Sequence, residues 1–390
     1  MPVSDKDSKT GNCDPCAIFL DYSRGAETGR DEWLFNFDRA SLTRNVRVLS
    51  ETYNHERLRW HARADSKANL DAFLTYDEKR IKWTSSLKQS LEAGVAASVS
   101  PEEIVESLYR PFTKSLLYFA TPFVHRQGRL PWIFPRGNHV GNAALAITCH
   151  SQVPFSTIAA DCIPALDVGG RPTQCFPFYT YDEDGTNRRE NVTDWALSEF
   201  RSHYNDRSIT KWQIFYYTYA LLHHPEYRER YAANLKRELP RIPYAPDFKS
   251  SAEAGEKLAE LHINYEKQPQ FALNEIENPK EKPTYHVEKM RLSKDKSTLF
   301  YNDFLTLTGI PAEAFEYRLG NRSALEWIID QYQVSTDKRS GIVNDPNRDD
   351  DEQYILRLIG QVIHVSLETM KLVKSLTTLG LEAKALAAEK

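Results

Sequence analysis

The chain has 390 residues, of which 41% are hydrophobic and 12% aromatic, enough for a sizeable core and more than one domain. Its net charge of −4 gives no overall sign of nucleic-acid binding, and its mean hydropathy of −0.57, without a long apolar run, excludes a membrane span. The polar start lacks the apolar core of a signal peptide, and five cysteines without a complete zinc pattern fit a reduced compartment, so we expect a cytoplasmic protein.

Helices are predicted for the first part of the chain. Residues 1–20 are rich in Gly, Asp and Pro and indicate a loose leader. A basic amphipathic helix is expected within residues 33–63, and a short one over residues 81–91. Ser100 begins an N-cap, first-turn proline and capping-box glutamate, which predict a helix that ends before Pro111.

The pattern changes to strands between residues 115 and 181. Five short segments there are rich in apolar, aromatic and threonine residues and are separated by Pro, Gly, Asn and Asp. They are residues 116–120, 132–135, 143–148, 155–159 and 174–181.

Helical spacing returns in the second half of the chain. Three consecutive helices are followed by a polar connector, a hairpin and a short helix, and a long helix follows an acidic loop. The helices are residues 211–222, 225–239 and 252–265, the connector 267–283, the hairpin 285–301, the short helix 311–317, the acidic loop 345–351 and the long helix 352–376.

The segment from Tyr317 to Tyr332 joins a glycine turn, two arginines and a capped helix. Ser323 and Glu326 have the spacing of a capping box, so a helix should begin there. A helix N-terminus with guanidinium groups beside it is a natural seat for a phosphate oxygen. The plainer interpretation is an ordinary capped helix with solvated arginines.

A second feature is the absence of any Asp or Glu between residues 107 and 160, although the chain has 54 acidic residues. One interpretation is a positive surface kept free of competing anions. The other is a β-rich core segment, in which carboxylates are scarce in any case. The basic residues of this stretch are Arg110, Lys114, Arg126, Arg129 and Arg136.

Signatures of a self-contained catalytic site are missing from the sequence. There is no P-loop, glycine-rich dinucleotide or S-adenosylmethionine turn, nucleophile elbow, or zinc-binding His-Glu-x-x-His, and the Asn/Asp-Pro-Pro-Tyr/Phe motif that holds a target adenine is also absent. His223 and His224 are adjacent and diverge on a helix, so we interpret them as turn residues. A site assembled from distant residues stays open as an alternative.

Several blocks, taken in order, resemble the C-terminal part of the Type ISP restriction–modification enzymes. Members of this family combine a nuclease, a helicase-type translocase, an N6-adenine methyltransferase and a DNA specificity domain in one chain. The blocks are residues 28–37, 81–88, 109–112, 214–231, 239–243, 317–332 and 340–348.

The resemblance implies a mixed α/β (α+β) fold, in which a strand-rich recognition module is flanked by a helical coupler and C-terminal spacer helices. The expected division is a loose leader at 1–20, a helical coupler at 21–108, a target-recognition α/β domain at 109–325 and a helical spacer at 326–390.

The implied function is sequence-specific binding of duplex DNA as the target-recognition part of a restriction–modification system. Chemistry would be done elsewhere, so S-adenosylmethionine, ATP and magnesium are expected only in the missing domains. The implied partners are duplex DNA and the methyltransferase/translocase portion. Two alternatives stay open: a truncated remnant that docks on a methyltransferase without binding DNA, and a free-standing enzyme with a dispersed active site.

The candidate DNA contacts come from the carboxylate-free stretch and from the capped-helix motif. Arginines would mostly meet phosphates, whereas Asn and Gln can read adenine. Loop residues considered as base readers are Gln127, Asn138, Asn142 and Gln152. The candidate set for DNA binding is Arg126, Arg129, Arg136, Asn138, Arg318, Asn321 and Arg322.

Overall fold

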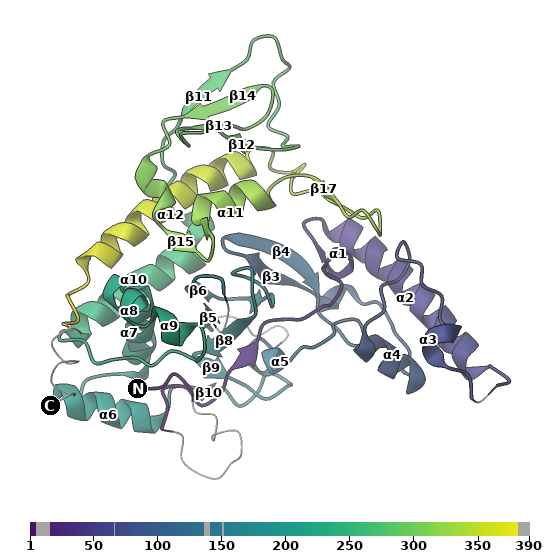
Figure 1. Ribbon diagram of the computed structural model, residues 1–390, viewed down its shortest axis with the longest axis horizontal. Helices are drawn as coiled ribbons and strands as arrows, with labels where there is room; N and C mark the ends of the chain where they lie inside the picture. Colours follow the sequence, from purple (N-terminus) through teal and green to yellow (C-terminus); the bar gives the residue numbers. More distant parts are fainter. Residues whose placement is uncertain (5–15, 66, 136–140, 150–151, 381–390) are drawn as a thin grey trace.

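The computed structural model describes residues 1–4, 16–65, 67–135, 141–149 and 152–380. Its ribbon has a triangular outline, with helices at two corners, a small sheet at the third, and further sheets between them (Figure 1). The expected mixed α/β fold is confirmed. No helix in the described ranges is both long and apolar enough to span a bilayer.

Two four-stranded sheets occupy the middle of the molecule. The first is antiparallel, in the order β1-β8-β5-β6, and the second has the order β2-β4-β3-β7, with β3 and β7 parallel. The first contains β1 (Ser23–Arg24), β8 (Thr173–Pro177), β5 (Ala144–Thr148) and β6 (Ser156–Ala160). The second contains β2 (Phe35–Asn36), β4 (Thr113–Tyr118), β3 (Ile104–Arg110) and β7 (Ile163–Pro164).

One helical corner is built around the long helix α2, and the other around the pair α7 and α10 (Figure 1). The first corner contains α1 (Asp31–Leu34), α2 (Arg39–His61), α3 (Leu70–Phe73) and α4 (Ser85–Glu92). The second contains α6 (Asp194–Tyr204), α7 (Lys211–His223), α8 (Pro225–Arg230), α9 (Ala232–Leu235) and α10 (Phe248–Ile263). In this second corner, a Cβ added at Gly255 would lie 1.9 Å from the Tyr216 carbonyl oxygen, so only glycine allows α10 to approach α7 so closely.

The third corner is an antiparallel sheet in the order β11-β14-β13-β12. Its strands are β11 (Asn274–Glu277), β14 (Leu305–Thr308), β13 (Thr298–Phe300) and β12 (Arg291–Leu292).

Three hairpins, three 3₁₀ turns and three further helices complete the described fold. They are β9 (Tyr179–Thr180) with β10 (Arg189–Glu190), β15 (Arg318–Leu319) with β16 (Arg322–Ser323), β17 (Ser335–Thr336) with β18 (Val343–Asn344), η2 (Pro101–Glu103), η3 (Tyr265–Lys267), η4 (Ala312–Phe315), α5 (Leu130–Ile133), α11 (Ala324–Gln331) and α12 (Tyr354–Ser375).

Two apolar clusters hold these parts together. One runs from Leu34 in α1 through the β2-β4-β3-β7 sheet to Leu358 in α12, so it joins the expected coupler, recognition and spacer regions. The other lies between α7, α10 and one face of the β1-β8-β5-β6 sheet. The expected boundaries after residues 108 and 325 fall inside β3 and α11.

The leader was predicted wrongly where it is described. Val3, Ile18 and Phe19 are fully buried, and Phe19 N–H donates a 3.0 Å hydrogen bond to the Val3 carbonyl. The Gly/Asp/Pro-rich composition predicted a loose segment, but its few apolar side chains are buried and fix it to the rest of the fold. Residues 5–15, including Cys13 of the Cys-x-x-Cys pair, lie outside the described residues.

The helix predicted from Ser100 is also wrong. Its proline and glutamates form only η2, and the chain then continues as β3, which pairs with β4 on one side and β7 on the other. Local capping signals were overridden by sheet pairing, which favours the β-branched and aromatic side chains of β3, Ile104, Val105 and Tyr109. Residues 132–135, predicted as a strand, instead form the end of α5 and the two residues after it, and α6 was not predicted at all.

Candidate nucleic-acid interface

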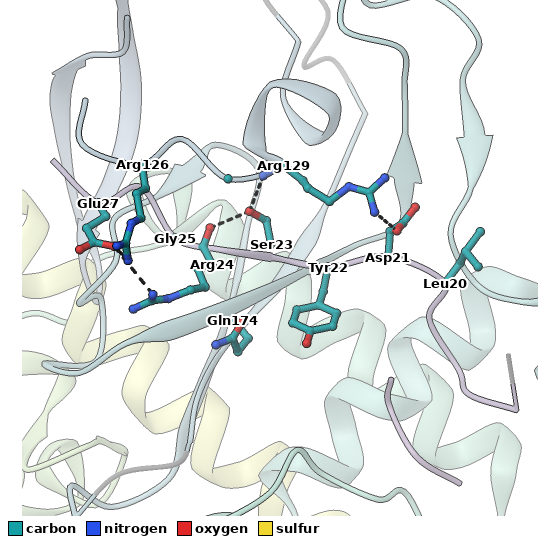
Figure 2. A pocket seen from close by; sticks show the side chains of 11 residues that line it. Leu20, Asp21, Tyr22, Ser23, Arg24, Gly25, Glu27, Arg126, Arg129 and Gln174 are labelled. Atoms are coloured by element: carbon teal, nitrogen blue, oxygen red, sulfur yellow. Dashed lines mark hydrogen bonds and ion pairs between the residues drawn. The ribbon is translucent and has the colours of Figure 1, made fainter. Parts of the chain in front are cut away.

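A hollow of about 570 Å³ opens at the edge strand β1. Its walls come from the segment around β1, the turn between Arg126 and Arg129, and Gln174 at the second position of β8 (Figure 2). Two residues of the predicted DNA-binding set, Arg126 and Arg129, thus lie in one site. We call this hollow the β1-edge pocket.

Arg129 forms one end of the β1-edge pocket. Its backbone N–H donates to Ser23 Oγ at 2.9 Å, and its guanidinium group forms an ion pair with Asp21. The Asp21 N–H in turn donates to Asn191 Oδ1 at 2.7 Å, and this hydrogen bond fixes the segment that leads from Asp21 into β1. The Arg129 side chain is 57% exposed, so the guanidinium group is within reach of an external anion.

Arg24 and Arg126 form the other end, where both reach towards Glu27 (Figure 2). The nearest nitrogen–oxygen distances to the Glu27 carboxylate are 3.8 Å and 3.5 Å, and the two arginine side chains are 45% and 62% exposed. Glu27 and Arg126 also exchange backbone hydrogen bonds of 3.1 and 2.8 Å. Long, exposed ion pairs of this kind contribute little stability, so a phosphate could replace the carboxylate at small cost.

One interpretation of the carboxylate-free stretch was a positive surface kept free of competing anions. That interpretation is wrong for three of its described basic residues. Lys114, Arg126 and Arg129 all pair with carboxylates supplied by other segments of the chain. Lys114 is the clearest case, because Glu106, Asp161 and Glu266 lie 3.0, 3.6 and 3.9 Å away and its side chain is only 15% exposed. A sequence stretch without acids is therefore not a surface without acids.

Two of the residues considered as base readers are used internally. Asn142 is buried, its Nδ2 donating to the carbonyls of Ile133 and Tyr179 and its Oδ1 accepting from the Tyr179 N–H. Gln127 donates from Nε2 to the Phe119 carbonyl at 3.3 Å. Asn142 is therefore unavailable to DNA. Arg136 and Asn138 lie outside the described residues.

The motif around Gly320 forms the β15–β16 hairpin and the start of α11. The predicted capping box is confirmed: Ser323 Oγ accepts from the Glu326 N–H at 3.2 Å, and the Glu326 carboxylate accepts from the Ser323 N–H at 2.8 Å. Burial alone would raise the pKa of Glu326, but hydrogen bonds from Lys296 and Ser323 lower it, so a carboxylate already occupies the first turn.

Both arginines of this hairpin have partners inside the chain. Arg318 donates to the Asn321 carbonyl and lies 3.7 Å from the Glu326 carboxylate. Arg322 donates to Asp330 at 2.9 Å and packs over the Trp327 ring at 4.9 Å. Each remains about half exposed, so each still presents charge to solvent.

The hairpin and the β1-edge pocket lie at the same end of one sheet. A Cβ on Gly320 would meet the Gly169 carbonyl oxygen at 2.9 Å, and one on Gly169 would meet Thr148 Oγ1 at 2.5 Å, where β5 ends. Strand β15 of the hairpin also lies against β6, and the edge strands β1 and β6 are three strand spacings apart, or about 14 Å. Arginines therefore flank this end of the sheet on both sides.

Sequence reasoning missed Arg24 and Gln174 in this pocket. Strand β1 has only two residues and gives no alternating pattern, so nothing in the sequence placed Arg24 beside β8. Gln174 was included in a predicted strand, but the pairing of that strand with a two-residue edge strand could not be foreseen.

The sequence of the chain matches one family over most of its length. Residues 17–358 match the model of the Type ISP C-terminal specificity domain, and the chain belongs to this family. The resemblance read from the ordered blocks is thereby confirmed. Comparison with the curated proteins gives no match.

Several solved structures superpose on nearly the whole chain. A nuclease-deletion mutant of the Type ISP restriction–modification enzyme LlaGI, in complex with a DNA substrate mimic, is 34% identical with a TM-score of 0.83 and covers 96% of this chain and 35% of its own. The DrdV–DNA complex is 34% identical with a TM-score of 0.85, over 97% and 38%. The ATP-dependent Type ISP enzyme LlaBIII bound to DNA is 29% identical with a TM-score of 0.85, over 97% and 24%. The chain therefore spans between about a quarter and two fifths of these relatives.

Proposed function

We propose that this chain binds duplex DNA sequence-specifically, as the target-recognition part of a Type ISP-like restriction–modification system. The observation that carries the proposal is the match of nearly the whole chain to enzymes whose structures contain DNA. The β1-edge pocket supplies basic side chains that can bind DNA, since Arg24, Arg126 and Arg129 gather around a concave surface.

The charges of the pocket favour an anionic ligand. Three guanidinium groups face two carboxylates, those of Asp21 and Glu27, which leaves an excess of positive charge at the surface. Such exposed arginines can bind the phosphates of DNA, which releases counterions from the DNA. The gain in binding free energy from this release falls as the salt concentration rises. Arg318 and Arg322 extend this positive charge to the β15–β16 hairpin.

The catalytic steps of such a system are assigned to other parts of it. Methyl transfer, nucleotide hydrolysis and cleavage need S-adenosylmethionine, ATP and magnesium, which we assign to the methyltransferase/translocase portion. That portion is the proposed protein partner, and a cytoplasmic location follows from a DNA target.

A titration of labelled duplex DNA with the purified chain tests the proposal. Fluorescence anisotropy at several salt concentrations should give a binding constant whose logarithm falls linearly with the logarithm of salt. A pool of duplexes with a randomised centre should yield one enriched sequence. A chain that binds no duplex at low salt, yet co-purifies with a methyltransferase after nuclease treatment, would instead be a protein-interaction module.

A further inference from the structure

Arg24 and Gln174 are direct partners across two neighbouring strands. In the antiparallel β1–β8 pair, Arg24 faces Gln174 and Ser23 faces Cys175. Residues opposite each other in such a pair point to the same face of the sheet, with Cβ atoms about 5 Å apart. Arg24 and Gln174 therefore present a guanidinium group and a carboxamide side by side.

The face of the sheet that carries Arg24 and Gln174 is covered by helices at β5 and exposed to solvent at β1. The next partner of Gln174 is Ile147 on β5, which is fully buried in the cluster beneath α7 and α10. Gln174 is half-buried, and Arg24 on the edge strand is exposed. The pair thus lies where the helical cover ends and the β1-edge pocket begins.

The hydrogen-bonding capacity of the pair is incompletely used. Gln174 Oε1 is buried and has no hydrogen-bond partner among the described residues. The Arg24 guanidinium group is 3.8 Å from the Glu27 carboxylate, beyond hydrogen-bonding distance. A buried polar atom without a partner costs free energy, which a ligand that supplies the missing donor would recover.

We propose that Gln174 and Arg24 are base-reading residues, with Gln174 contacting an adenine and Arg24 a guanine on a neighbouring base pair. The inference rests on the proposed function and deepens it. Gln174 Oε1 accepts from adenine N6–H and its Nε2 donates to N7, while the Arg24 guanidinium group donates to guanine O6 and N7. The spacing of the two side chains is compatible with base pairs stacked about 3.4 Å apart. Arg126 and Arg129, at the rim, contact the phosphates that flank these bases.

The test compares enriched sequences rather than overall affinity. The wild-type chain and its Gln174→Met and Arg24→Ala variants each select from a pool of duplexes with a randomised centre. Methionine keeps the length of glutamine without its hydrogen bonds. Gln174→Met should lose about tenfold preference for adenine at one position, and Arg24→Ala a similar preference for guanine at a nearby position. The other positions should be unchanged.

Controls separate this inference from the function on which it rests. Gln89→Ala, on the exposed side of α4, should select the wild-type sequence. Gln174→Asn, which keeps the amide but shortens its reach, should give the same single-position loss as Gln174→Met. If the wild-type chain enriches no sequence, the proposed function fails. If it enriches one and Gln174→Met enriches the same sequence, or loses every duplex alike with unchanged circular dichroism, the assignment of Gln174 is overturned.

Discussion

Arg30 donates a hydrogen bond from Nη1 to the Phe123 carbonyl, 2.9 Å away, although its side chain is completely buried. Its Nη2 donates at 2.6 Å to Thr84 Oγ1, which is the N-cap of α4. Burial lowers the pKa of Arg30 to about 10, so the group stays charged at neutral pH. One guanidinium group therefore fixes α1, α4 and the turn that leads to Arg126 relative to one another.

Replacing Arg30 by lysine should destabilise the chain. A single ammonium group cannot reproduce the planar fork that reaches Phe123 and Thr84 together, and a buried acceptor would be left without its donor. We expect a loss of about 3 kcal/mol of unfolding free energy, measured from the midpoint of urea denaturation. Arg39→Lys, at the exposed start of α2, is the matched control. Equal midpoints for the two variants would show that the Arg30 contacts are dispensable.

His262 lies in a buried chain of hydrogen bonds. The Ala159 N–H donates to the Tyr219 hydroxyl at 2.8 Å, and that hydroxyl shares a hydrogen bond of 2.5 Å with His262 Nδ1. On the other side of the ring, His262 Nε2 shares a hydrogen bond of 2.8 Å with Thr369 Oγ1. Burial, and secondarily Arg228, lower the pKa of His262 to about 3. The folded chain thus holds this ring neutral.

The chain should therefore lose stability as the pH falls below 6.5. Between pH 6.5 and about 3 the unfolded chain binds a proton at this position that the folded chain does not, which costs about 1.4 kcal/mol per pH unit. His262→Gln keeps a donor and an acceptor but does not titrate, so its plot of stability against pH should be shallower by that amount. Gln89→Ala, at an exposed position of α4 that does not titrate, should leave the plot as it is. Parallel plots for wild type and His262→Gln would contradict the argument.

Long periodic helices and the apolar strands β5, β6 and β8 could be predicted from the sequence, whereas β3 and the two-residue strands could not. The helices around Leu42, Leu221 and Leu358 carry their own apolar stripes, and each was foreseen. Strand β3 was mistaken for a helix because its partners β4 and β7 lie elsewhere in the chain. The site shows the same limit. Arg126 and Arg129 were identified, but the pairing of Arg24 with Gln174 depends on a two-residue strand.

Arg126 and Arg129 should affect DNA binding through charge and not through sequence. If each meets a phosphate, Arg126→Ala and Arg129→Ala will each lower the slope of log K against log salt by about 1 and weaken all duplexes alike. Asp21→Asn should act in the opposite direction, because it frees the Arg129 guanidinium group from its internal partner. Arg207→Ala, on the exposed turn after α6, is the control. Unchanged slopes for both arginine variants would remove the pocket rim from the interface.

Arg318 and Arg322 test whether the β15–β16 hairpin also contacts DNA. Their guanidinium groups are held by Glu326 and Asp330, yet each is half exposed, at the same end of the sheet as the β1-edge pocket but on the β6 side. We expect Arg318→Ala to lower the salt slope by about 1, since its 3.7 Å ion pair is weak. Arg322→Ala should instead lower the melting temperature, because Arg322 packs over Trp327 and donates to Asp330. A salt slope that neither substitution changes would assign the hairpin to packing alone and confine the DNA contacts to the other edge of the sheet.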